Sequence, residues 1–66
     1  MSQLDFYVTR AAEAKRDAEA ATLSNVRERC LRAEAAWSDM AARAERGEKM
    51  RAKLDAEKAE ALASAG

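Results

Sequence analysis

The apolar residues of this chain fall in two rows, and the second row is out of step with the first. The first row is Leu4, Tyr7, Ala11, Ala14, Ala18 and Ala21; the second is Leu23, Val26, Cys30, Ala33, Trp37, Met40, Ala44 and Gly47. Steps of three and four residues place each row on one side of an α-helix. If continued, the first row would next meet the polar residues Asn25, Glu28 and Arg32. A reversal of the chain explains this shift better than one straight helix, whose apolar side would jump to the opposite face.

Composition favours helix on both sides of this reversal. The chain has no Pro, two Gly and many Ala, Glu, Lys and Arg residues, and no window alternates apolar and polar residues as a strand would. We expect one domain, residues 1–66, with a helix over about 3–21, a turn at 22–24 and a helix over about 24–63. Capping boxes are expected at Ser2 with Asp5 and at Asn25 with Glu28.

The predicted fold is therefore an all-α antiparallel helical hairpin whose second helix is the longer one. With the turn between Leu23 and Ser24, Tyr7 faces Met40 and Ala11 faces Trp37. The main core is expected in the cluster of Leu4, Phe6, Tyr7, Trp37 and Met40. Gly47 either kinks the second helix or leaves it uninterrupted, and the alternative fold is one continuous helix about 90 Å long.

The apolar surface is small for a chain that must fold alone. Eighteen of its 66 residues are Ala, which leaves only fourteen larger apolar side chains. Chains of this size bury only about 60% of the surface that they expose when unfolded. We therefore expect a dimer that forms a four-helix or coiled-coil assembly. The candidate core and interface residues are Leu4, Phe6, Tyr7, Val26, Cys30, Leu31, Trp37, Met40, Met50 and Leu54.

Most catalytic and metal chemistry lacks its usual residues here. There is no His, only one Cys and no glycine-rich phosphate loop. We expect no enzymatic activity, no catalytic residue, no cofactor and no metal. Cys30 is expected to act as a small apolar core residue. The alternative is a redox-active thiol, made more reactive by the neighbouring Arg27 and Arg29.

Two locally basic stretches raise a different possibility. The first holds Arg27, Arg29 and Arg32, and the second, residues 43–53, holds five Arg or Lys and two Glu. Acids stand four residues before bases in the pairs Glu28–Arg32, Asp39–Arg43 and Glu45–Lys49, which is typical of a solvated helix face. With a formal net charge of zero, nucleic acid is a poor candidate partner.

The distribution of apolar and basic residues also bears on where the protein acts. No apolar stretch approaches the ~20 residues that span a bilayer, and the first residues have no basic segment followed by an apolar one. We expect a cytoplasmic protein that does not insert into membranes; a peripheral membrane contact through the basic stretch near Met50 and Leu54 is a weaker alternative.

Residues 25–46 resemble the central segment of short Ala- and Arg-rich bacterial proteins. The resemblance rests on the sequence NVRERCLR, followed by Ala36-Trp37 and Met40-Ala41. It implies a small bacterial helical protein and brings no activity, ligand or partner. The predicted function is a small interaction or oligomerisation module that self-associates or docks a helix on a protein partner. The alternative is a nucleic-acid-associated regulator that uses the two basic stretches.

Overall fold

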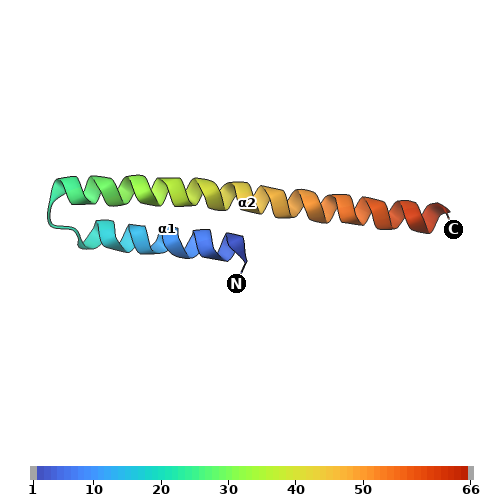
Figure 1. The fold of residues 1–66 in the computed structure, drawn as a ribbon, viewed down its shortest axis with the longest axis horizontal. Coiled ribbons are helices and arrows are strands. Elements are labelled where there is room, and N and C mark those ends of the chain that lie inside the picture. Colours follow the sequence, from blue (N-terminus) through green and yellow to red (C-terminus); the bar gives the residue numbers. More distant parts are fainter. Residues whose placement is uncertain (1, 66) are drawn as a thin grey trace.

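Two antiparallel α-helices form the chain over residues 2–65, the part that a computed structural model describes (Figure 1). Helix α1 is Gln3–Ala20 and helix α2 is Ser24–Ala65. The two lie side by side, and α2 continues far beyond the start of α1, so the molecule measures 65 × 17 × 11 Å. The helical hairpin predicted from the two apolar rows is confirmed, and the single continuous helix is wrong.

One predicted helix cap is confirmed and the other is wrong. The Ser2 hydroxyl oxygen accepts a hydrogen bond of 3.1 Å from the Asp5 backbone N–H, which caps α1. The Arg27 N–H instead donates to the Leu23 carbonyl at 3.0 Å. Because α2 begins at Ser24, Asn25 already has a helical backbone and does not stand at the capping position. The reversal occupies residues 21–23 and not 22–24.

The deepest burial lies between the small residues of the two rows. Ala14 and Ala18, at 8% and 3% exposure, are the buried apolar residues among residues 2–65. The main core was expected among the aromatic residues, and that location was wrong. Two helices enclose only the narrow strip where their surfaces touch, so a methyl group fits inside it while a large ring extends beyond its edge.

Helix α2 continues without interruption through Gly47, which has no positive φ. Residues 45–65, called the overhang below, project past α1 and are exposed along their whole length (Figure 1). None of the helices in the described part of the chain combines the length and the apolarity that crossing a membrane requires.

Candidate interaction surface

Three aromatic rings meet where α1 lies against the middle of α2. The ring centroid of Trp37 is 5.8 Å from that of Phe6, edge to face at 88°, and 6.0 Å from that of Tyr7. Phe6 and Tyr7 are themselves 5.9 Å apart. These spacings and tilts are those at which aromatic pairs attract one another. The predicted meeting of α1 and α2 through these rings is confirmed, and we call Phe6, Tyr7 and Trp37 the aromatic cluster.

Two polar side chains contact the aromatic cluster at its edge. The guanidinium carbon of Arg10 lies 5.2 Å from the centre of the Trp37 ring, within the range of a cation–π contact. The Gln3 amide nitrogen Nε2 donates a 2.8 Å hydrogen bond to the Tyr7 hydroxyl. Neither contact was predicted. Arg10 is, however, next to Ala11, which the predicted register sets opposite Trp37, so that register could have found the Arg10 contact.

The aromatic cluster remains open to solvent on one side. Phe6 is 46% exposed, and Met40, which lines a depression of about 310 Å³ together with Tyr7, is 38% exposed. The position of Met40 beside Tyr7 agrees with the predicted register of the two helices. The result is an apolar surface with a polar border, which is the arrangement found at protein interfaces.

The structure does not gather all ten candidate residues in one place. The half-buried ones are Leu4, Tyr7, Val26, Cys30 and Trp37, and the exposed ones are Phe6, Leu31, Met40, Met50 and Leu54. Leu31 lines a separate depression of about 360 Å³ with Lys15 and Glu19. Met50 and Leu54 lie in the overhang. Two further surfaces therefore accompany the aromatic cluster.

Cys30 is half-buried and lines a third depression, of about 160 Å³, with Ala14, Ala33 and Trp37. Arg27, one of the two residues expected to make its thiol reactive, instead donates a 3.0 Å hydrogen bond from Nη2 to the Ala21 carbonyl. The depression beside Cys30 is also lined by the charged residues Arg10, Glu13 and Asp17.

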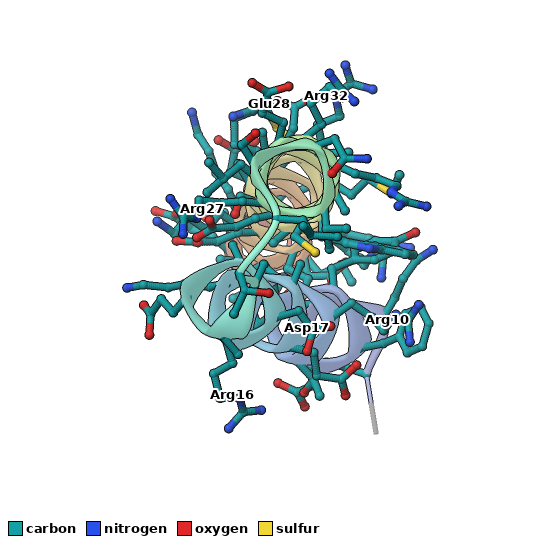
Figure 2. All side chains as sticks on the ribbon, turned by 90° about the vertical axis from the view of Figure 1, so that its left-hand side faces the viewer. Arg10, Arg16, Asp17, Arg27, Glu28 and Arg32 are labelled. Carbon is teal, nitrogen blue, oxygen red and sulfur yellow. The ribbon has the colours of Figure 1, made fainter. Side chains whose placement is uncertain are left out.

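The first basic stretch does not form one surface. In the view along the hairpin, Arg27 lies at the side of the molecule, while Arg32 points outward from α2 (Figure 2). Arg29 follows Arg27 by two residues, which turns it by about 200° around the helix. Arg32 lies three residues after Arg29 and on the same side of α2, so only Arg27 of this stretch points in a different direction.

The second basic stretch is partly neutralised by neighbouring acids on the same helix. Arg43 pairs with Asp39 at 3.2 Å and Lys49 pairs with Glu45 at 2.9 Å, as predicted. The hydrogen bond from Lys49, together with its positive charge, lowers the pKa of Glu45 below its usual value. The predicted Glu28–Arg32 pair is not among the ion pairs of residues 2–65.

The overhang carries opposite charges at its two ends. Its first part, with Arg43 just before it, belongs to the basic stretch 43–53, which has five basic and two acidic residues. Its later part, residues 55–60, has three acidic residues and one Lys. All of these side chains are exposed. The uncovered helix therefore has a basic segment followed by an acidic one.

Comparison with family models, with curated proteins and with solved structures gave no match. The resemblance seen in residues 25–46 thus adds nothing to the functional assignment, which depends on the surfaces described above.

Proposed function

We propose that this protein is a non-enzymatic interaction module that self-associates as a dimer through its helical hairpin. One observation carries the proposal: eight large apolar side chains stay exposed while only Ala14 and Ala18 are buried within residues 2–65. The exposed ones are Phe6, Val8, Leu23, Leu31, Met40, Met50, Leu54 and Leu62.

This distribution of burial favours association for an energetic reason. Removing apolar surface from water is the main favourable contribution to folding, at about 25 cal/mol per Å². A single hairpin leaves much of that contribution unused, and it still loses the conformational entropy of ordering both helices. A second copy that covers the open side of the aromatic cluster would bury Phe6 and Met40 and stabilise both chains.

Sedimentation equilibrium and far-ultraviolet circular dichroism, measured on the same samples from about 1 to 500 μM, test this proposal. We expect the mass to rise from one chain to two and the unfolding temperature to rise with concentration, because association stabilises the folded state. A folded monomer with an unfolding temperature independent of concentration would contradict the proposal.

A nucleic-acid-associated regulator has weaker support. Arg46, Arg51 and Lys53 are exposed and form no ion pair within residues 2–65, so they are available to phosphates. Against this, Arg27 points away from Arg29 and Arg32 of the first basic stretch, and the acidic residues 55–60 lie on the same helix as the second. Binding to a labelled duplex and to a single strand at low salt separates the two functions, since phosphate contacts give a steep loss of affinity with added salt.

A further inference from the structure

The overhang is a helix without a partner, and its charges are arranged to fit a second copy of itself. It continues α2 for about as many residues as α1 covers, and its first residues, Gly47, Glu48 and Arg51, line a depression together with the start of α1. Its basic segment comes first and its acidic segment second. Two parallel overhangs would set like charges side by side, whereas two antiparallel ones set each basic segment beside an acidic one.

We propose that the overhangs of two copies pair antiparallel, with the two-fold axis near Lys53. This inference rests on the proposed self-association and adds the overhang to the aromatic cluster as a second contact surface.

The charged residues match in this arrangement. Residues equally distant from Lys53 lie level with each other across the two-fold axis, which sets Arg46 opposite Glu60 and Arg51 opposite Asp55 of the other copy. Lys49 and Glu48 are likewise level with Glu57 and Lys58 of the other copy, but they lie about 140° and 120° around the helix from Leu54 and so point away from it. Each pair occurs twice in a symmetric dimer. Lys53 itself meets its own copy, and it is the one charged residue of the overhang from Glu48 to Glu60 that has a like charge opposite.

Helix geometry places these pairs at the edges of an apolar row. Gly47, Leu54 and Ala61 recur every seven residues and so lie on one side of α2. Arg46 and Glu60 fall on one flank of this row, and Arg51 and Asp55 on the other. In an antiparallel pair, each flank meets the same flank of the other helix. The Leu54 side chains, 55% exposed in one chain, then lie within one turn of Met50 of the other copy.

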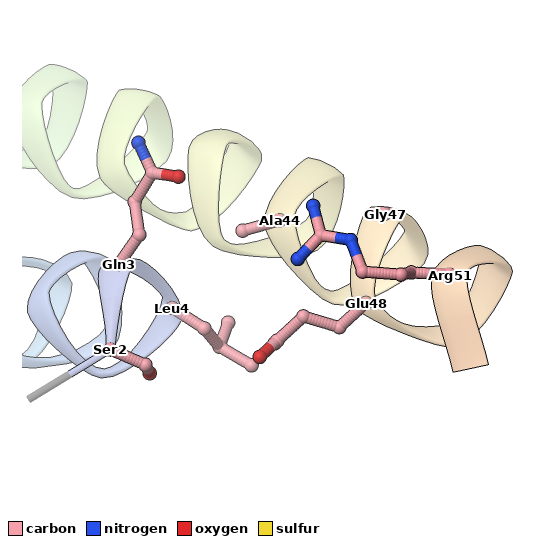
Figure 3. Close-up of a pocket in the computed structure, with 7 residues that line it drawn as sticks. All are labelled: Ser2, Gln3, Leu4, Ala44, Gly47, Glu48 and Arg51. Atoms are coloured by element: carbon pink, nitrogen blue, oxygen red, sulfur yellow. The ribbon is translucent and has the colours of Figure 1, made fainter. Parts of the chain in front are cut away.

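A depression at the start of α1 provides a place for the far end of the other overhang. It has a volume of about 310 Å³ and lies where Leu4 of α1 approaches Ala44, Gly47, Glu48 and Arg51 of α2 (Figure 3). In the antiparallel register Leu62 of the second copy lies level with Ala44. Leu62 is 66% exposed in the single chain, and this depression would cover it with Leu4 and Ala44.

Charge-reversal variants of the full chain test the pairing. The acidic variant carries Arg46→Glu and Arg51→Glu, and the basic variant carries Asp55→Arg and Glu60→Arg. Each alone turns four attractions of the dimer into repulsions, so we expect each to raise the dimer dissociation constant at least tenfold. An equimolar mixture restores all four attractions and should form the heterodimer with an affinity near that of the natural chain.

The matched control is Arg16→Glu with Arg32→Glu. It makes the same change in net charge, on side chains that point outward from opposite sides of the hairpin (Figure 2). We expect its dissociation constant to stay within about threefold of the natural one. If the acidic variant dimerises as tightly as this control, or if the mixture forms no heterodimer, the overhang pairing is overturned while the proposed self-association stands. If the natural chain is a monomer throughout, both are overturned.

Disulfide crosslinking tests the direction of the pairing. In a Cys30→Ser chain, Gly47→Cys should crosslink to Ala61→Cys on another copy, because the two positions lie nearly level. Gly47→Cys alone should not crosslink to itself, since two copies of residue 47 are ~18 Å apart along the antiparallel helices and a disulfide requires Cα atoms within about 7 Å. Rapid crosslinking of Gly47→Cys to itself would show a parallel pair and overturn the inference.

Discussion

The side chain of Arg27, in the first turn of α2, donates a 3.0 Å hydrogen bond to the carbonyl of Ala21 at the end of α1. A positive charge at this position also interacts favourably with the carboxyl-terminal end of the α1 dipole. Arg27→Met removes the donor and the charge but keeps an unbranched side chain. We expect the free energy of unfolding to fall by about 0.5–1 kcal/mol in urea titrations followed by circular dichroism.

Arg29→Met is the matched control for this prediction. It removes the same charge two residues away, where the side chain points to the opposite side of α2 and makes no hydrogen bond or ion pair within residues 2–65. Equal destabilisation by both variants would show that the total charge, and not the contact with Ala21, determines the effect.

A leucine at position 18 should separate the two helices. Ala18 is only 3% exposed and lies in the narrow strip between α1 and α2, so Ala18→Leu adds bulk where there is no room. We expect a loss of about 1–3 kcal/mol in the free energy of unfolding. Ala20→Leu, at an exposed position of the same helix, should change stability by less than ~0.5 kcal/mol. A neutral Ala18→Leu would contradict the close approach of the helices.

Much of this fold could be predicted because the apolar rows that mark helices depend only on the spacing of residues along the sequence. The shift between the rows located the reversal to within one residue, and Ser2 with Asp5 marked the first helix start. The start of the second helix was misplaced because Asn25 is a residue type that often caps helices. In the structure, the first helical hydrogen bond instead joins the Arg27 N–H to the Leu23 carbonyl. Sequence spacing also did not show that methyl groups, and not rings, fill the contact strip.

The candidate surfaces were harder to predict because they depend on direction in space. Residue types identified Phe6, Leu31 and Leu54 as possible contact residues but could not show that they lie on three separate surfaces. Likewise, the contact of Arg27 with Ala21 depends on how the turn folds back, which brings together groups six residues apart. In contrast, the basic segment and the acidic segment of the overhang are visible in the sequence once α2 is known to be continuous.

Because the aromatic cluster is open on one side, we expect two substitutions on α1 to weaken dimerisation to different degrees. Phe6→Ser removes an exposed ring next to Trp37, while Val8→Ser removes an exposed side chain that points to the opposite side of the helix. We expect Phe6→Ser to weaken dimerisation about tenfold or more and Val8→Ser to change it by less than threefold, measured by sedimentation equilibrium. If the two substitutions weaken dimerisation equally, the contact between the hairpins does not include the aromatic cluster.

Acid should break the ion pair between Glu45 and Lys49. The hydrogen bond and charge of Lys49 hold the pKa of Glu45 below its usual value of 4.5. The pair therefore stabilises the helix fully above that value, and its contribution is lost as the pH falls through the lowered pKa. In Lys49→Gln we expect the pKa of Glu45, followed by NMR of its carboxyl carbon, to rise towards 4.5. Lys53→Gln is the control and should leave it unchanged.

Gly47 lies inside an uninterrupted helix and has no structural need to be glycine. Its φ is not positive, and a Cβ atom built on it meets nothing within 4 Å. Glycine loses more conformational entropy than alanine in a helix, at a cost of about 1 kcal/mol. Gly47→Ala should therefore raise the helical content measured by circular dichroism at low protein concentration. Ala52→Gly, at an exposed position of the same overhang, should lower it by a similar amount. If Gly47→Ala lowers the helical content, residue 47 lies against another part of the protein, because only a collision at the added methyl group outweighs the gain in helix propensity.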